Sequence, residues 1–172
     1  MSVKNFSATE FLRNGSRAEI RALRPEDRDS LLAAVGRTGE RSLYRRFFAS
    51  KRGFTEQEVN FYVNVDFVSH VALVAELEED GQKYIVGGAR YILVQPGRAE
   101  VAFAVVDEHQ GRGIGSALMH HLQVIATEAG LTELFAEVLP ENAAMMRVFD
   151  RSGLDVTTTR GADSIHVVLR LP

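Results

Sequence analysis

The sequence predicts an α+β fold in a single domain, and two observations support this prediction. The expected elements follow the order strand, helices, three strands, helix, strand, helix and two strands. The chain also lacks an internal repeat, a low-complexity tract and a linker, and its 172 residues are enough to bury a proper core. We therefore expect one domain over residues 1–172, a sheet of six to seven strands flanked by helices, and a loose or irregularly packed segment at residues 1–16.

The first half of the chain is predicted to hold one strand and three helices. Residues 17–23 alternate in hydropathy, which is typical of a strand. Pro25, with two acidic residues directly after it, suits the first turn of a helix. Residues 42–48 predict a short second helix. Thr55 and Glu58 have the spacing of a capping box, which predicts the start of a third helix.

The second half of the chain supplies most of the predicted sheet. Strands are expected at residues 70–77, 84–94, 101–106, 134–139, 154–159 and 165–169. A long helix is predicted by apolar residues at positions 114, 118, 122, 125 and 129, with Gly130 placed as a C-terminal glycine. The segment Pro140-Glu141-Asn142 predicts the start of a last helix, which Gly153 ends.

Composition excludes several classes of protein. The net charge of −3 gives no general attraction to nucleic acid or to an anionic membrane. The absence of cysteine excludes a disulfide framework, a cysteine nucleophile and a Cys-ligated metal. The five histidines show no metal-ligand spacing, so we expect no metal site and interpret them as structural or solvated. Because the first residues lack an apolar signal core and no apolar run approaches a membrane span, we expect a cytoplasmic protein.

The most informative stretch is a glycine-rich turn between an apolar strand and the long helix. Gly111, Gly113 and Gly115 allow close approach of the backbone to a ligand, and the helix N-terminus presents unpaired N–H groups and a positive dipole end. This arrangement predicts an anion site. A P-loop is excluded because no Gly-Lys-Ser/Thr tripeptide occurs, and a dinucleotide fingerprint fits poorly because position 116 is Ser.

The spacing Gln110-x-x-Gly113-x-Gly115 after an apolar strand resembles the pyrophosphate loop of the GCN5-related N-acetyltransferase (GNAT) family. The order of elements is similar to that family over nearly the whole chain. The resemblance implies a mixed, mostly antiparallel sheet whose two central strands splay apart, and acetyl-CoA as the acetyl donor. It also implies a set of cofactor-binding residues: Phe103, Ala104, Val105, Gln110, Gly111, Arg112, Gly113, Ile114, Gly115, Ser116 and Asn142.

Some of these positions have a second interpretation. The resemblance implies that the Val105 N–H polarises the thioester carbonyl, while Phe103 and Val105 also suit simple core packing. Asn142 resembles a cofactor contact, but Asn also favours helix N-caps. Arg112 either adds charge to the loop or is solvated.

Glu100 is the predicted catalytic base, because an amine must lose a proton before it attacks. The family's lysine-modifying members carry a glutamate at this position, ten residues before the loop. The alternative is an exposed carboxylate or a partner in an ion pair. Glu137, on the neighbouring predicted strand, is the second candidate. Phe149 stands where the family often has a Tyr that protonates the leaving thiolate, so the sequence offers no general acid there.

Residues 42–76 are similar to the acetyltransferase domain of bacterial protein-lysine acetyltransferases. The resemblance implies direct transfer in a ternary complex, with a protein lysine as acceptor, for which an acyl-CoA synthetase is a candidate. A small-molecule amine acceptor, a non-catalytic acyl-CoA sensor and a nucleotide-binding protein remain alternatives. The basic residues between 45 and 52 suit an acidic partner, a CoA phosphate or, more simply, a solvated helix face. We expect no nucleic-acid or membrane partner, and a monomer or homodimer.

Overall fold

The computed structural model describes residues 3–36, 55–106 and 110–172. The strands are β1 (Ser7–Phe11), β2 (Arg17–Ala22), β3 (His70–Glu79), β4 (Gln82–Gln95), β5 (Arg98–Val105), β6 (Glu133–Val138), β7 (Asp155–Arg160) and β8 (Ile165–Arg170). The α-helices are α1 (Arg28–Gly36), α3 (Glu56–Val63), α4 (Ile114–Glu128) and α5 (Ala143–Asp150), and two short 3₁₀ turns are η1 (Val3–Asn5) and η2 (Pro25–Asp27). The helix predicted at residues 42–48 and the basic residues around it lie outside the described residues.

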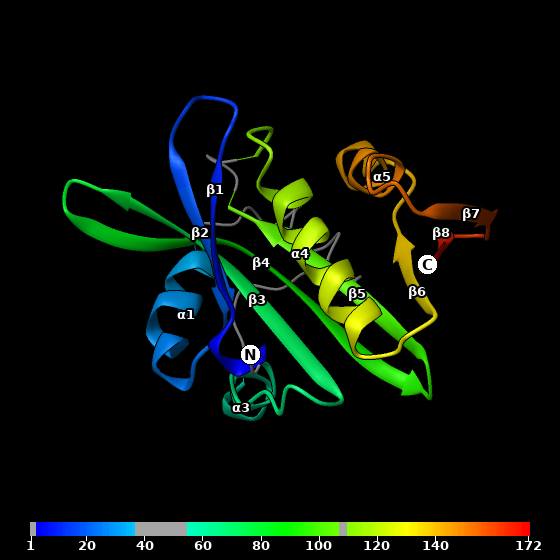
Figure 1. Ribbon diagram of the computed structural model, residues 1–172, viewed down its shortest axis with the longest axis horizontal. Helices are drawn as coiled ribbons and strands as arrows, with labels where there is room; N and C mark the ends of the chain where they lie inside the picture. Colours follow the sequence, from blue (N-terminus) through cyan, green and yellow to red (C-terminus); the bar gives the residue numbers. More distant parts are fainter. Residues whose placement is uncertain (1–2, 37–54, 107–109) are drawn as a thin grey trace.

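One sheet organises the described residues, in the order β1-β2-β3-β4-β5-β6-β8-β7. Every neighbouring pair is antiparallel except β5 and β6, which run parallel. The mixed, mostly antiparallel sheet therefore agrees with the prediction, although it has eight strands rather than six or seven. Helix α4 lies across β4 and β5, while β6, β8 and β7 form the end of the sheet that lies nearest to α5 (Figure 1).

The extra strand is β1, which corrects the prediction of a loose N-terminal segment. Ser7–Phe11 pairs with β2 through five register pairs, from Ser7↔Arg21 to Phe11↔Arg17. The hairpin turns at Asn14-Gly15, where Gly15 has φ 85°. Asn-Gly is a strong hairpin signal, but the residues of β1 alternate only between exposed and half-buried. The strand is held by backbone pairing, so hydropathy alone gave no indication of it.

Two apolar layers cover the two faces of the sheet. The larger core lies on the face covered by α4 and α5, and we call this side the α4 face. Its fully buried side chains include Leu118, Leu122, Leu134 and Phe149. A smaller cluster that includes Ala34, Ala72 and Val106 lies on the opposite side, which we call the α3 face because α1 and α3 pack there. Each fully buried aliphatic side chain contributes about 1.5–3 kcal/mol.

The helix ends follow the local sequence signals. Thr55 accepts a hydrogen bond from the Glu58 N–H at 3.1 Å, and Glu58 accepts one from the Thr55 N–H at 3.1 Å, so the predicted capping box begins α3. Helix α4 buries the predicted stripe of Ile114, Leu118, Leu122 and Ile125 but ends at Glu128. Ala129 is the exposed C-cap rather than part of the apolar stripe, because Gly130 turns the chain with φ 85°.

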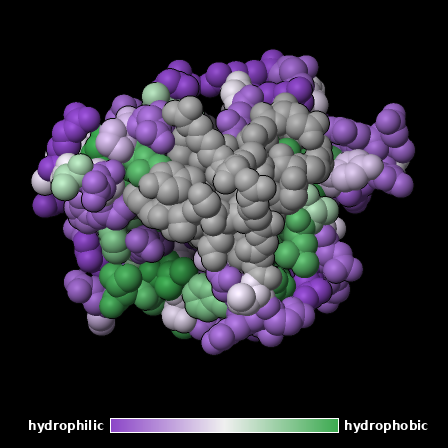
Figure 2. Space-filling model, turned by 180° about the vertical axis from the view of Figure 1, so that it is seen from behind, coloured by the Kyte–Doolittle hydropathy of each residue, from purple (hydrophilic) through white to green (hydrophobic). Residues whose placement is uncertain are grey.

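The view from the other side shows hydrophilic residues around the rim and hydrophobic patches beside the residues drawn in grey (Figure 2). Phe61 and Val68 are among the exposed apolar side chains of the described residues, with 52% and 74% of their surface accessible. Among the parts of the chain that the structure describes, no helix has the length and apolar character needed to cross a membrane.

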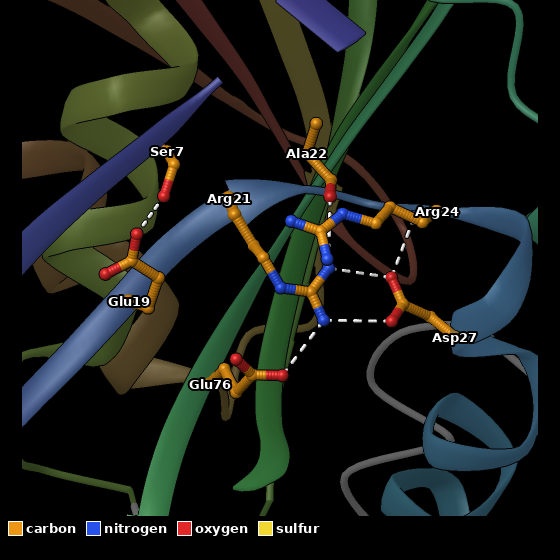
Figure 3. A network of polar contacts seen from close by, with 7 residues as sticks. All are labelled: Ser7, Glu19, Arg21, Ala22, Arg24, Asp27 and Glu76. Atoms are coloured by element: carbon orange, nitrogen blue, oxygen red, sulfur yellow. Dashed lines mark hydrogen bonds and ion pairs between the residues drawn. The ribbon is translucent and has the colours of Figure 1, made fainter. Parts of the chain in front are cut away.

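A buried ionic network ties β2 to β3 and to the start of α1 (Figure 3). The Arg21 guanidinium donates to both carboxylate oxygens of Asp27 at 2.8 and 2.9 Å and to Glu76 at 2.9 Å. The Arg24 N–H donates to Asp27 at 2.7 Å. Burial alone would raise the pKa of Asp27, but the hydrogen bonds from Arg21 and Arg24 outweigh it, and the pKa is lowered.

Removal of the Asp27 charge is expected to destabilise the fold. Asp27→Asn leaves Arg21 buried with only Glu76 to balance it, so we expect a loss of about 3 kcal/mol in the free energy of unfolding by urea at pH 7. Because the folded pKa of Asp27 is lowered, its contribution is present above the unfolded pKa of about 3.9 and is lost as pH falls further. The deficit should therefore shrink below about pH 4. Asp163→Asn, at an exposed position, is the control; an equal loss at pH 7 and at pH 3 would contradict a charge effect.

Candidate active site

A cavity of about 520 Å³ opens where β5 and β6 separate. These two strands pair only at Arg98↔Glu133, Ala99↔Leu134 and Glu100↔Phe135. Beyond these pairs both strands continue, to Val105 and Val138, without a register between them. The predicted splay of the central strands is therefore present in the described residues, and it creates the cavity.

Most of the predicted site residues line this cavity, with Arg112 as the exception. Those that line it are Glu100, Phe103, Ala104, Val105, Gln110, Gly111, Gly113, Ile114, Gly115, Ser116 and Asn142. They come from β5, from the loop before α4, from the first turn of α4 and from the N-cap of α5. The structure thus brings together segments that are about forty residues apart in the sequence.

The hydrogen-bond pattern of β5 decides which backbone groups face the cavity. The Val106 N–H donates to the Val86 carbonyl of β4 at 2.8 Å. Because this direction alternates along an antiparallel pair, the N–H and C=O groups of Val105 and Phe103 point away from β4, toward the gap. The Gln110 side chain donates to the Val105 carbonyl at 3.0 Å from that side. The Val105 N–H therefore points into the gap between β5 and β6.

The loop before α4 has the geometry of an anion site. Gly111 and Gly113 have φ values of 81° and 95°, which disfavour any side chain. Gly113 is the N-cap of α4, so the N–H groups of the first turn lie at the cavity mouth. A Cβ atom on Gly115 would lie 3.2 Å from Val148 Cγ2, which explains why α4 and α5 need a glycine there to pack closely.

Three arginines that sequence reasoning missed also line the cavity: Arg13, Arg147 and Arg151. Arg13 follows β1 in the N-terminal hairpin, and its N–H donates to the Arg112 carbonyl at 3.3 Å. Arg147 and Arg151 lie one helical turn apart at the end of α5. All three are exposed, and none forms an ion pair with a residue that the structure describes. They add positive charge beside the glycine loop, so the donor set suits a multiply charged anion such as a diphosphate.

The two predicted carboxylates lie on the α3 face. Glu100 is exposed, near the start of β5, and Glu137 is exposed on β6. Glu137 accepts a hydrogen bond from Ser164 at 2.8 Å and lies 2.5 Å from His166 Nδ1. Burial alone would raise the pKa of Glu137, but the hydrogen bonds from His166 and Ser164 and the charge of His166 lower it. Glu137 is therefore the weaker base candidate, because a base works best with a pKa near the working pH.

Phe149 and Asn142 occupy the wall of the cavity on the α4 face. Phe149 is fully buried and packs edge-on against Phe103, with ring centroids 6.0 Å apart. Asn142 accepts a hydrogen bond from the Met145 N–H at 3.1 Å, so it is the N-cap of α5 and lines the cavity as well. Met145 also lines the cavity while it packs against the core.

Three of the four described histidines, His70, His121 and His166, form pairs with charged side chains. His121 lies 2.5 Å from Glu10, His70 lies 2.8 Å from the Arg90 guanidinium, and His166 contacts Glu137. Within the described residues, no group of three or more His, Cys, Asp or Glu side chains could hold a metal ion. The sequence did not indicate that His166 contacts Glu137, a carboxylate that lines the cavity.

Comparisons with known proteins agree with this geometry. The model of the acetyltransferase (GNAT) family matches residues 40–154. Acetyltransferase Pat of Mycolicibacterium smegmatis is 36% identical over 146 residues, which make up 83% of this chain and 42% of Pat. Acetyltransferase PA5475 of Pseudomonas aeruginosa is 29% identical over 163 residues, or 94% of this chain and 87% of that protein. The chain thus spans less than half of Pat but most of the second relative.

A solved structure gives the same result for the fold. The GNAT domain of S. lividans PAT matches with a TM-score of 0.86 and 32% identity, covering 96% of this chain and 97% of that one. The fold predicted from the sequence is therefore confirmed.

The pKa of Glu137 provides a test of the contacts described at the cavity. His166→Leu removes one hydrogen bond and the positive charge but leaves the hydrogen bond from Ser164, so the pKa of Glu137 should rise above its value in the unchanged protein. Carboxyl ¹³C NMR titration measures this directly. His120→Leu, on the exposed side of α4, is the control. The same Glu137 titration in the His166 variant would show that the contact does not form in solution.

Proposed function

The chain belongs to the acetyltransferase (GNAT) family of acetyl-CoA-dependent N-acetyltransferases, and we propose that it moves the acetyl group to a lysine side chain of a protein. The observation that supports this best is the path of the cavity through the sheet. The cavity extends from the glycine loop at Gly111 and Gly113, which we call the anion loop, to the exposed Glu100 carboxylate on the α3 face. A long cosubstrate with a phosphorylated end and a reactive thioester end fits such a path.

The residues of the loop would hold the cosubstrate. The N–H groups after Gly113 and the side chains of Arg13 and Arg147 suit its phosphates, because donors and positive charge converge there. The gap beyond Glu100↔Phe135 suits its extended arm. Acetyl-CoA supplies an acetyl group already activated as a thioester. Its acetyl carbonyl would accept a hydrogen bond from the Val105 N–H, which acts as a one-donor oxyanion site.

Glu100 would take the proton of the acceptor. A lysine ammonium must become a neutral amine, and a carboxylate at the open end of the cavity can accept that proton directly or through a water molecule. The amine nitrogen then forms a bond to the acetyl carbon, the C–S bond breaks, the sulfur leaves as a thiolate, and the nitrogen releases its second proton to water. Phe149 has no proton to give, so water would protonate the thiolate.

Two observations support a protein lysine as the acceptor: the exposure of Glu100, and the similarity of residues 42–76 to bacterial protein-lysine acetyltransferases. Glu100 is exposed, so a side chain on a large partner can reach it. A small amine could reach it as well, and an acyl-CoA synthetase is one candidate among protein acceptors. A non-catalytic acyl-CoA sensor is the second candidate function, and the observation that favours it is the full burial of Phe149 in place of a hydroxyl group.

Glu100→Gln is expected to lower kcat for acetylation of a lysine peptide by about 10²–10⁴-fold, because general base catalysis typically contributes that much. The Kd for acetyl-CoA should not change. Thiol release measures turnover and calorimetry measures binding, with Glu128→Gln on the exposed end of α4 as the matched control. Unchanged turnover in the Glu100 variant would remove it as the base. Tight binding of acetyl-CoA by the unchanged protein, with no turnover on any peptide or synthetase, would favour the sensor.

The cavity arginines give a separate test of cosubstrate binding. Arg13→Gln and Arg147→Gln should each raise the Kd for CoA about three- to tenfold, since each removes a charge-assisted contact near the solvent. The effect should fall as salt is added. Arg160→Gln on the outer strand β7 is the control. Equal CoA affinity in all three variants would place the phosphates elsewhere.

A further inference from the structure

We propose that Tyr62 and Glu137 form an acceptor subsite for a long, unbranched primary ammonium, an assignment that rests on the proposed function. The sequence offered Glu137 only as a second candidate base and did not single out Tyr62. In the structure both line the cavity together with Glu100. In this subsite Tyr62 covers the aliphatic part of the acceptor and Glu137 attracts its charge, while Glu100 removes the proton.

The three side chains follow one another across the α3 face of the sheet. Arg90 of β4 pairs in register with Ala102 and donates to the Tyr62 carbonyl at 3.1 Å, which places the end of α3 over β4. Glu100 lies on the next strand, β5. Glu137 follows on β6, two residues beyond Phe135, the register partner of Glu100. Paired strands would put the Cα atoms of Glu100 and Glu137 about 8 Å apart, and the separation of β5 and β6 beyond this pair makes the distance larger.

Contacts with Arg90 of β4 hold Tyr62 in place. The Arg90 guanidinium lies 4.9 Å from the centre of the Tyr62 ring and 2.8 Å from His70 Nε2. His70 is buried and packs against the ring of Phe61 at 5.1 Å. These contacts fix the end of α3 against β4. A ring fixed in this way offers an apolar surface to an alkyl chain at little cost in conformational entropy.

The Glu137 carboxylate is also held in place by neighbouring side chains. Ser164 and His166 each approach a different oxygen of Glu137, and both belong to the β7–β8 hairpin or its turn. An ionised carboxylate has about four acceptor directions, so two contacts leave capacity for an ammonium. Arg98, the cation on the same face of β5, is bound to Glu133 at 2.5 Å and lies 4.0 Å from the centre of the Phe135 ring. It is therefore engaged away from Glu137.

Glu137 has a different role from Glu100, which accepts the proton. The hydrogen bonds from Ser164 and His166 keep Glu137 ionised, and the acceptor directions that its oxygens keep open can bind an ammonium while Glu100 takes up the proton. The aromatic ring and the charge together select an acceptor with both an alkyl arm and a positive end. A neutral nucleophile without an arm gains from neither side chain.

The experiment compares two acceptors, Nα-acetyl-lysine methylamide and hydroxylamine, which is small and uncharged near neutral pH. In Glu137→Gln and in Tyr62→Leu, the KM for the lysine derivative should rise about fivefold, whereas the KM for acetyl-CoA should not change. The enzyme-dependent rate with hydroxylamine, after its uncatalysed reaction with the thioester is subtracted, should not change either. Glu128→Gln and Tyr84→Leu, at exposed positions, are the matched controls. Parallel changes with both acceptors, or an unchanged KM for the lysine derivative, would overturn the subsite.

A binding measurement separates this proposal from the transfer reaction itself. The Kd of the lysine derivative for the protein saturated with CoA is measured by NMR, without turnover. Absence of acetyl transfer by the unchanged protein would refute the proposed function alone. Weaker binding in Glu137→Gln by about fivefold would still support the subsite, and equal binding would refute it. If the two variants lose only thermal stability, with both KM and Kd unchanged, Tyr62 and Glu137 are structural.

Discussion

Strands β5 and β6 are neighbours for only three residue pairs, and the rest of the site depends on this limit. Backbone N–H and C=O groups inside a protein need hydrogen-bond partners. Past Glu100 the groups of β5 that face β6 find no strand opposite them, and the Gln110 side chain meets one of them, the Val105 carbonyl. The adjacent N–H can then serve a ligand. Because the strands diverge, the backbone N–H and C=O groups of β5 that face β6 are available to a ligand, whatever side chains β5 carries.

Close packing of α4 sets where the anion loop lies relative to this gap. A Cβ atom on Gly87 would lie 3.1 Å from the Ala104 carbonyl and 3.2 Å from Ile114 Cγ2, so a side chain on β4 would push the helix away. Gly115 plays the same part between α4 and Val148 of α5. With both glycines, the first turn of α4 rests directly over the opening of the strands. The helix N-terminus and the gap therefore form one continuous cavity.

The sequence was sufficient for the parts of the site that are contiguous in the chain. The run from Glu100 to Ser116 predicted the strand, the turn and the helix start, because each depends on local spacing. Arg13 and Tyr62 could not be found in this way. They reach the cavity through the β1–β2 hairpin and through a contact between α3 and β4, which are tertiary features. Asn14-Gly15 was a usable signal for the hairpin, but it does not say that the hairpin tip meets the loop at Arg112.

The absence of a hydroxyl at position 149 weighs less against catalysis than the pattern of the sequence indicates. A thiolate is a much weaker base than an alkoxide and can leave without prior protonation, whereas a lysine amine has an ordinary pKa of about 10.4 and starts almost fully protonated. The proton on the acceptor is therefore the larger obstacle, because a protonated amine has no lone pair with which to attack. The described cavity has its carboxylates on the exposed α3 face, where an acceptor would enter, and an apolar ring, Phe149, on the opposite wall. Such a site provides a base where one is most needed and leaves protonation of the thiolate to solvent, which fits an enzyme better than it fits a passive sensor.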